Sequence, residues 1–455
     1  MMASSDATVL AHPAVVALVG RLEARLAVLE ADLATLRTEN AALRARLAQP
    51  PKTPQNASVP APKRGAKPGH RGVSRRRVAA PAVDAVLVCR PETCGRCGHG
   101  LPAQGGAVIA RRQQVELPPV RPVVTEAQRL RVRCRHCGHH SRGQYPAGVA
   151  AHGRCGPRLL ATISLLHEQH QVGYERLATL LGELFGVTVS EGTLVAAVQR
   201  VAGVLEPAAT AIAAQVRHSG VVGSDETGAR VDGVNWWEWV FQSTDAAYHT
   251  ICRRRNTDVV LRFLAGVQPG VWVSDLWQPQ LAAPAARYQI CVAHQLRDLQ
   301  YAIDGQHGAA QTWAQTFQAL LREAVQRRHQ QDDGAASVGG AAVARIETAC
   351  DVLLAETLPT GWSAALQRRY RPHRQALFVF LHDPTVPPTN NASERRLRPS
   401  VVHRKVSGGF RSEAGATAYA ILRTVADTVR KRAQPVFAVL LAALDPATAL
   451  IPQPA

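Results

Sequence analysis

The sequence predicts an α/β protein whose central sheet follows an N-terminal helix and a metal-binding module. Three patterns support this prediction: short apolar strands that end in aspartates, two C-x-x-C pairs, and a heptad repeat near the N-terminus. The 455 residues leave room for about three domains. A hydrophobic content of 46% excludes wholesale disorder.

The N-terminal residues 1–48 are predicted to form a coiled-coil zipper. Two rows of residues recur every seven positions: Val15, Leu22, Leu29, Leu36 and Leu43, and Val19, Leu26, Leu33, Asn40 and Leu47. Asn40 at an a position favours a two-stranded coil in register, because only the partner's asparagine satisfies its amide. In a parallel pair, three contacts between chains would join opposite charges: Arg25–Glu30, Asp32–Arg37 and Glu39–Arg44. A single helix packed on its own domain gives no reason for these pairs, so we expect a homodimer.

Residues 49–83 are predicted to form a flexible basic linker. The segment is dense in proline and poor in large apolar residues, so it cannot bury enough surface to offset its ordering entropy. Basic residues such as Lys63, Arg71 and Arg75 either follow DNA phosphates or belong to a merely solvated linker.

Residues 84–150 are predicted to form a zinc-binding module. Two C-x-x-C-G-H sequences supply Cys94 and Cys97 in one loop and Cys134 and Cys137 in another. Each loop places two thiolates on one side of a tight turn, and the glycine lets backbone amides point at sulfur. Together the four cysteines suit one tetrahedral, structural Zn²⁺ ion. A redox-active C-x-x-C would require a single pair in a βαβ setting, which this sequence lacks.

The spacer between the two loops is longer than in a usual zinc ribbon. Its 36 residues contain apolar-rich stretches at 108–115 and 123–132 on either side of Pro118-Pro119, which predicts an inserted hairpin. The isolated cysteines are expected to be ordinary thiols: Cys89, Cys155, Cys252, Cys291 and Cys350.

Residues 151–205 are predicted to be helical, with helices over 157–170, 174–184 and 190–201. Gly186 begins the turn before the third helix, and Ser190 is expected to cap it. A short helix, a glycine-containing turn and another helix make the helix-turn-helix layout. Plain helical bundles share this pattern, so DNA reading and simple packing both remain open.

The segment 206–432 is predicted to hold the central sheet. Strands are expected at 221–225, 236–243, 248–253, 270–275 and 288–292, with a helix from Gln295. The order β-β-β-α-β-α-β resembles a ribonuclease-H-like fold. In that architecture the first strand and a later one lie side by side, so Asp225 and Asp275 would meet at one edge of the sheet.

A third carboxylate, Glu394, is expected in the first turn of a later helix that Ser393 or Asn391 can start. Three converging carboxylates repel one another unless cations neutralise them. Hard oxygen ligands select Mg²⁺ or Mn²⁺, and two such ions about 4 Å apart can clamp an in-line phosphoryl displacement. Each acid alone is more often a turn, cap or helix-terminus residue, so the prediction of catalysis depends on all three together.

Six motifs occur along the chain in this order: Asp225-Glu-Thr-Gly, Trp237-Glu-Trp-Val, Val273-Ser-Asp275, Cys291-Val-Ala-His294, Pro387-Pro-Thr-Asn-Asn-Ala-Ser-Glu394 and Ser407-Gly-Gly-Phe-Arg. Together they resemble the insertion sequence 66 family of bacterial DDE transposases. The zipper, the Gly-His-Arg-Gly linker and the C-x-x-C-G-H pairs are also similar to that family, so the resemblance spans nearly the whole chain.

The resemblance implies that Asp225, Asp275 and Glu394 are the catalytic triad. It also implies that His294 and Arg297 lie near it, His294 as a further catalytic candidate and Arg297 as a DNA contact. The sequence departs from the family at Asp275-Leu-Trp, where the family usually has an Asp-Gly-Tyr type of start.

The residues between the second and third acids are predicted to form a helical insertion over 308–381. Trp313, Phe317, Leu320 and Leu321 have core spacing, and 332–340 is expected to be a loop. The insertion either shapes a DNA channel or simply stabilises the domain. Further helices are expected at 414–432 and 435–444, the second within a C-terminal helix and tail at 433–455.

A run of basic residues follows Glu394. We expect it to place scissile phosphates, although a solvated face has the same pattern. The run comprises Arg395, Arg396, Arg398, Arg404, Lys405 and Arg411.

The charge balance favours a polyanionic partner. Lys and Arg number 53 against 34 Asp and Glu, which gives a net charge of +19. No apolar run reaches the roughly 18 residues of a membrane span, and the N-terminus has no signal-peptide pattern. We therefore expect a cytoplasmic, nucleoid-associated protein without membrane contact.

Together these features predict a transposase that cleaves element ends and joins their 3′-hydroxyls to target DNA in a metal-dependent reaction. The resemblance also implies small element-encoded companion proteins. Two alternatives stay open: a catalytically silent, sequence-specific DNA-binding regulator, and a structural zinc-containing dimer, which the charge disfavours.

Overall fold

The computed structural model describes residues 13–47, 77–145, 155–332 and 339–444. The chain divides into two compact units, Met1–Ala61 with Pro146–Leu177 and Glu191–Ala455, and Pro62–Tyr145 with Ala178–Ser190. Parts of three expected features lie outside the described residues: the linker up to residue 76, the loop at 333–338 and the tail beyond 444.

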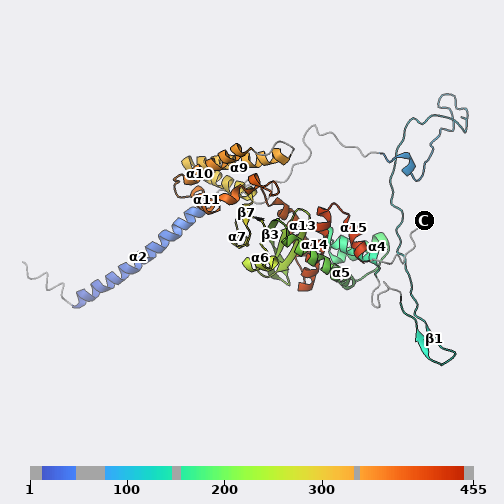
Figure 1. Ribbon diagram of the computed structural model, residues 1–455, viewed down its shortest axis with the longest axis horizontal. Helices are drawn as coiled ribbons and strands as arrows, with labels where there is room; N and C mark the ends of the chain where they lie inside the picture. Colours follow the sequence, from blue (N-terminus) through green and yellow to red (C-terminus); the bar gives the residue numbers. More distant parts are fainter. Residues whose placement is uncertain (1–12, 48–76, 146–154, 333–338, 445–455) are drawn as a thin grey trace, which may run out of the picture. The chain divides into compact units, whose positions relative to one another are not determined.

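Helix α2 (Pro13–Leu47) is continuous over 35 residues (Figure 1). Its proline stands at the first helical position, where the missing N–H is not needed. Four leucines on it are 48–62% exposed: Leu26, Leu29, Leu33 and Leu36.

A five-stranded mixed sheet forms the centre of the first unit, in the order β5-β4-β3-β6-β7. The strands are β3 (Val221–Val231), β4 (Val234–Gln242), β5 (Ala247–Cys252), β6 (Val271–Ser274) and β7 (Arg287–Ile290). β3, β4 and β5 are antiparallel neighbours, whereas β6 pairs in parallel with both β3 and β7. The five expected strands are confirmed, and β3 is longer than expected.

A two-residue turn explains the length of β3. Asp232 and Gly233 join β3 to β4, and both have positive φ angles, 48° and 71°. This Asp-Gly pair suits the turn whose twist matches that of the strands it joins. The ladder therefore continues to the Val231–Val234 pair.

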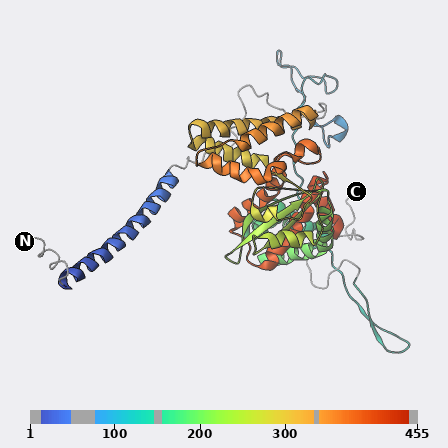
Figure 2. The ribbon, with the colours of Figure 1, turned by 60° about the vertical axis from the view of Figure 1, so that its left-hand side comes forward.

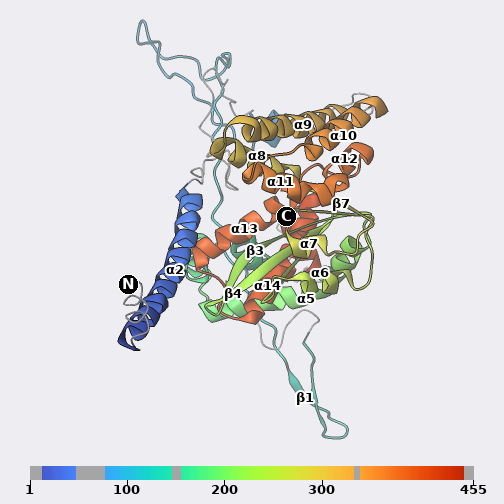
Figure 3. The same ribbon diagram turned by 90° about the vertical axis from the view of Figure 1, so that its left-hand side faces the viewer.

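Helices cover both faces of the sheet (Figure 3). On one face, Val222, Trp239, Phe241 and Trp272 pack against α6 (Thr257–Leu264) and the end of α5 (Glu191–Arg217). On the other face, Val240 and Ala247 pack against α13 (Asn391–Ser407), and Ala229, Val231 and Trp236 against α14 (Glu413–Lys431).

The helical insertion is present and packs on β6 (Figure 2). It comprises α9 (Gly308–Asp332), α10 (Gly340–Ala355), α11 (Trp362–Tyr370), η3 (Arg371–Leu377) and α12 (Val379–His382). The expected core residues Trp313, Phe317, Leu320 and Leu321 are buried there with Val271 and Val273 of β6. The segment leaves and rejoins the sheet at one place, since the Val292 amide donates to the Pro388 carbonyl at 3.0 Å.

Three helix boundaries differ from those expected. The first expected helix is α3 (Pro157–Ser164) followed by a π-helical turn, η2 (Leu165–Gln169), in which Glu168 is buried. The helix expected at Gln295 is α8 (Val292–Gly305), so His294 lies in its first turn. The helix expected to end near residue 201 is α5, which continues through Pro207 because Leu205, Ala209, Ala213 and Val216 extend its buried face.

The remaining helices are α4 (Tyr174–Phe185), the short α7 (Gln278–Leu281) and α15 (Val436–Leu444). The two helices expected at the C-terminal end are thus confirmed as α14 and α15. Among the described helices, only α5 is long and apolar enough to cross a membrane by length and composition, and its apolar face packs in the unit's core.

The second unit is built around the two cysteine loops. Its regular elements are η1 (Ala80–Ala82) and a short hairpin of β1 (Arg131–Arg133) and β2 (His140–Arg142). The prediction of an inserted hairpin over 108–115 and 123–132 is wrong: apart from β1, these residues form no strand. Pro118 and Pro119 cannot donate to a ladder, and the Gln113 side chain instead exchanges two hydrogen bonds with the Val78 backbone.

Candidate active site

Asp225 and Asp275 occupy equivalent positions on neighbouring parallel strands. In the register of β3 and β6, Gly223 is opposite Val273, and each aspartate follows two residues later. Parallel strands lie about 4.8 Å apart, and residues two apart share a face. Gly223 faces α13, because a Cβ added there would lie 3.2 Å from Ser393 Oγ. Both aspartates are therefore directed to the α13 side of the sheet.

The carboxyl of Asp225 lies in a strongly negative environment. Burial raises its pKa well above the ordinary value, and the charges of Glu226, Asp275 and Glu394 add to this effect. The charges of Asp275 and Glu394 thus reach Asp225, although the ligand oxygens of the three acids do not all lie within 4.8 Å of one another in the described part of the chain. Such a cluster favours the entry of a cation.

The start of α13 is fixed to β3 by buried side chains. Asn390 is the N-cap residue, and its Nδ2 donates to the Ser224 carbonyl at 2.6 Å. Ser393 Oγ donates to Asn390 Oδ1 at 2.6 Å and accepts from Gln242 Nε2 at 2.8 Å. These bonds hold Glu394, in the first turn of α13, next to Asp225. Of the two expected starts, Asn391 is confirmed as the first residue of the helix, and Asn390 before it is the N-cap residue.

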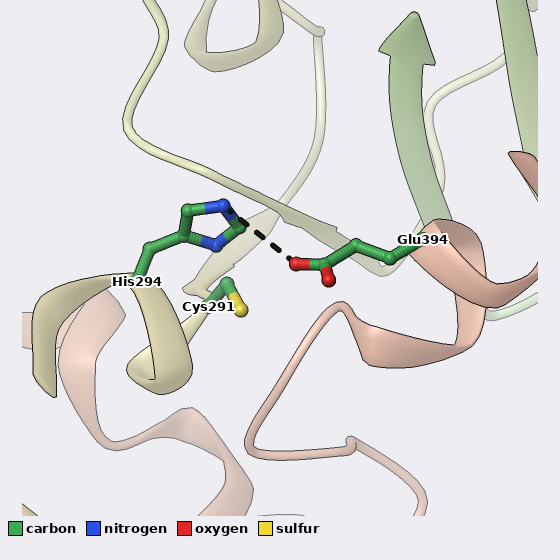
Figure 4. Close-up of side chains that lie close together, drawn as sticks. All are labelled: Cys291, His294 and Glu394. Carbon is green, nitrogen blue, oxygen red and sulfur yellow. Dashed lines mark ion pairs between the residues drawn. The ribbon is translucent and has the colours of Figure 1, made fainter. Parts of the chain in front are cut away.

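His294 and Arg297 lie beside Glu394, as the family resemblance implies. Glu394 Oε1 is 3.6 Å from His294 Nε2 (Figure 4). It is also 3.6 Å from Arg297 Nη2. Burial and the charge of Arg297 lower the pKa of His294, although Glu394 and Asp275 oppose this. Arg297 is therefore the permanent cation next to the acids.

Cys291 joins the same group from the residue before α8 (Figure 4). Among the described residues, Cys291, His294 and Glu394 form the one group of three potential metal ligands whose ligand atoms lie within 4.8 Å of one another. Burial raises the pKa of the Cys291 thiol to about 11, and its sulfur accepts a hydrogen bond from the Asn390 amide at 3.1 Å. The thiol thus ties α8 to α13, and the oxygens of the acids are the better ligands.

The oxygen donors of this site fit a hard divalent cation. Glu394 Oε1 is buried and has no hydrogen-bond partner in the described part of the chain. Asp225 and Asp275 add carboxylate oxygens, the ligands that Mg²⁺ and Mn²⁺ prefer. A bound cation would satisfy the unpaired oxygen and relieve the repulsion among the acids.

A fourth carboxylate, Glu226, was not identified from the sequence, although it follows Asp225 directly. Its side chain is 3% exposed and accepts from Gln280 Nε2 at 2.8 Å and from Arg255 Nη2 at 2.9 Å. The loop after Asp275 closes over it, and the Trp277 amide donates to Asp275 Oδ1 at 3.1 Å. The departure at Asp275-Leu-Trp thus forms an ordered turn that holds Asp275.

A buried charge network joins the sheet to α14. The ring of His249, on β5, contacts Glu238 Oε1 at 2.9 Å and Asp427 Oδ2 at 3.1 Å. Arg423 Nη2 donates to Asp427 Oδ2 at 2.7 Å, and its Nε lies 3.4 Å from Glu168 Oε1. Each of these five side chains is at most 2% exposed. No periodic pattern in the sequence predicts this network.

The basic run after Glu394 divides into two groups. Arg395, Arg398, Lys405 and Arg411 are exposed. Arg396 lies 3.7 Å from Asp427, and Arg404 donates to the Gly228 carbonyl. The first group is therefore available for phosphates, whereas the second also has partners within the fold.

The two cysteine loops have the same local geometry. In each, the residue after the second cysteine, Gly98 or Gly138, has a φ of 74° and donates to the first cysteine's carbonyl at 2.9 Å. Backbone amides of the loop lower the pKa of Cys94 and of Cys134. Each loop thus favours a thiolate, as a zinc ligand requires. The described coordinates do not bring the two pairs into one group of ligands.

Comparisons with known proteins are consistent with both sites. Residues 152–418 match the family model described as Transposase IS66 family, and residues 91–138 match the zinc-finger binding domain of transposase IS66. The first match includes all three acids, and the second includes all four paired cysteines. A comparison with curated proteins finds no match.

Proposed function

The chain belongs to the IS66 family of transposases, and we propose that it cleaves the ends of its element and joins them to target DNA by DDE chemistry. The equivalent positions of Asp225 and Asp275 in the register of β3 and β6, with the charge of Glu394 acting on Asp225, carry this proposal. A match over more than half of the chain supports the transposase role itself.

We assign the sheet to the ribonuclease-H-like class. Three antiparallel strands followed by two parallel ones, with the first strand at the centre of the sheet, support this assignment. Asp225 on the central strand and Asp275 after its parallel neighbour are the positions at which this class carries its first two acids.

Asp225, Asp275 and Glu394 would hold two Mg²⁺ or Mn²⁺ ions. When bound, such ions activate the attacking oxygen and stabilise the leaving oxygen of a phosphodiester. Arg297 and His294 hold Glu394 in place, and the exposed arginines of α13 would bind the DNA backbone.

The reaction has two steps of the same kind. Water attacks the phosphorus at the element end, the P–O3′ bond breaks, and the element strand receives a free 3′-hydroxyl. That hydroxyl then attacks a phosphorus of the target, one P–O bond forms, and the target's own O3′ leaves with a proton. No covalent intermediate with the protein is needed.

The zinc-finger domain and the helical region 151–205 would recognise the element ends. One Zn²⁺ ion held by Cys94, Cys97, Cys134 and Cys137 would order the two loops as one module. The helix-turn-helix interpretation of α3, α4 and α5 stays a proposal.

We further propose that α2 pairs two chains, as two element ends require. Four exposed leucines on one helix support a partner surface. Sedimentation should show a dimer that dissociates in Leu33→Lys, which places a charge in the seam. Ala31→Lys, outside the seam, should stay dimeric, and a monomeric wild type would refute the zipper.

The chemistry is tested by strand cleavage of end DNA in Mg²⁺. Asp225→Asn and Glu394→Gln should lower the rate by at least about a hundredfold while DNA binding persists. Asp232→Asn, in the exposed β3–β4 turn, is the matched control and should cleave normally. If the wild type binds DNA but cleaves it in neither Mg²⁺ nor Mn²⁺, the silent-regulator alternative holds.

A further inference from the structure

An arginine outside the basic run is held rigidly beside Glu226, the residue that follows Asp225 on β3. The guanidinium of Arg255 lies between two indole rings, 4.3 Å from the centroid of Trp237 and 4.2 Å from that of Trp277. Its Nε and Nη2 both donate to Glu226 Oε1, at 3.2 and 2.9 Å. We call Trp237, Arg255, Trp277 and Glu226 the arginine clamp.

The clamp holds the neighbours of both catalytic aspartates. Glu226 directly follows Asp225 on β3. Trp277 lies two residues after Asp275, and its amide donates to the Asp275 carboxylate. Because the charge of Asp275 acts on Glu226, the clamp lies within electrostatic reach of the triad.

An ion pair with Glu226 alone does not account for this arrangement. To neutralise the Glu226 carboxylate, the guanidinium of Arg255 needs only the edge that carries Nε and Nη2. Here two indole rings also lie within 4.3 Å of the guanidinium carbon, which restricts the orientation of the group and lowers the entropy lost when a ligand binds. The remaining nitrogen, Nη1, makes no hydrogen bond to the described residues, and the side chain is 40% exposed.

The free edge suits a phosphate oxygen. An in-plane N–H donor with a fixed direction is the geometry that binds phosphate oxygens.

We propose that Arg255 is a phosphate-binding residue that positions the DNA backbone next to the acid site. This inference rests on the proposed function, since it requires DNA at the triad. Its contact is with the backbone, so it is independent of base sequence.

The test measures binding of the full-length protein to a fluorescein-labelled duplex of arbitrary sequence over a range of salt concentrations. Arg255→Gln should weaken binding by roughly tenfold and make the slope of log K against log[salt] shallower by about 0.9. Arg254→Gln is the matched control: it removes the same charge from the same loop, where Arg254 is 64% exposed and pairs with Asp258. It should change the slope much less.

The double variant Glu226→Gln/Arg255→Gln separates phosphate binding from charge neutralisation. If Arg255 binds phosphate, the double variant stays as weak as Arg255→Gln. Recovery of wild-type binding in the double variant, or equal slopes for Arg255→Gln and Arg254→Gln, overturns the proposal. Thermal melts identify variants that fail to fold. If Arg255→Gln unfolds because Glu226 loses its partner, the double variant lacks that buried charge, and its binding to the duplex then tests the proposal. A wild type that binds no duplex would instead refute the proposed function.

Discussion

Asn390 shows how single side chains assemble the candidate site. Its amide joins the Ser224 carbonyl on β3 to the Ser393 hydroxyl on α13, and its backbone N–H reaches Cys291. Three segments that are distant in sequence thus meet at one residue that is 2% exposed. Removing the amide would leave a buried carbonyl and a buried hydroxyl without these partners.

Asn390→Ala is therefore expected to lower the free energy of unfolding by about 1–3 kcal/mol. The rate of strand cleavage should fall even under conditions where the variant is fully folded, because Glu394 loses its fixed position. Urea unfolding and cleavage assays at a temperature where the variant stays folded separate the two effects. Asn391→Ala, one position along and partly exposed, is the control. If both substitutions lower the cleavage rate equally, Asn390 does not position Glu394.

The sequence identified the acids but not the residues that hold them. Asp225, Asp275 and Glu394 stand out because each has a local signal, a strand end or a helix start. Asn390, Glu226 and Arg255 have partners that only the fold brings close: Asn390 and Ser224 are 166 residues apart. No periodicity encodes such a pairing.

At the scale of elements, the network around His249 fastens α14 to the sheet. Burial disfavours the charged ring, but hydrogen bonds to Asp427 and Glu238 outweigh it and raise the pKa of His249. Ser400 of α13 donates to Glu238 at 2.9 Å, so the helix that carries Glu394 is also joined to the network. The cation of His249 therefore stabilises the elements behind the active site.

The network predicts that stability falls as pH rises through neutrality. Between the ordinary value of 6.5 and its raised folded pKa, native His249 keeps a proton that the unfolded chain has lost. Burial also raises the pKa of Glu168 from 4.5 to about 7, which acts in the same direction. The contribution of His249 and Glu168 to the free energy of unfolding should thus decrease with pH from about 4.5 upward.

His249→Gln should lower the free energy of unfolding by about 3 kcal/mol near pH 6 and flatten the decrease above pH 6.5. Chemical unfolding at a series of pH values measures both effects. His307→Gln, on an exposed ring, is the control. A variant with the full wild-type slope above pH 6.5 would show that His249 is neutral in the native state.

The sequence patterns predicted most helices and strands correctly, but several of their first and last residues were not predicted. α5 continues past Pro207 because a buried face outweighs the loss of one hydrogen-bond donor. The expected hairpin in the spacer of the zinc-finger domain is absent because its apolar residues have no layer to pack on: Ile109 is 97% exposed and Val124 88%. Apolar alternation predicts a strand only where another surface covers it.

At the scale of the whole molecule, a zinc ion is expected to join the two cysteine loops into one folded module. Each cysteine loop is preorganised for thiolates, yet the two pairs do not form one ligand group in the described coordinates. A single ion that binds all four sulfurs would close the long loop between Cys97 and Cys134. Metal binding and ordering of this domain would then be one process.

We therefore expect one zinc per chain and loss of this zinc in Cys137→Ser. The variant should be cleaved faster by protease between residues 77 and 145, while the sheet-containing unit stays intact. Elemental analysis and limited proteolysis measure these effects, with Cys89→Ser, an isolated and exposed thiol, as the control. Full zinc content in Cys137→Ser, or two ions per chain, would refute the four-cysteine site.

The helical insertion is attached to the sheet at several points along β7, which has a consequence for the site. Besides the bond between Val292 and Pro388, Gln289 of β7 bonds to the Leu377 carbonyl and to the Phe380 amide, and Arg287 pairs with Asp383. Substitutions that loosen this attachment should therefore also displace α8, the helix that carries His294 and Arg297 next to Glu394.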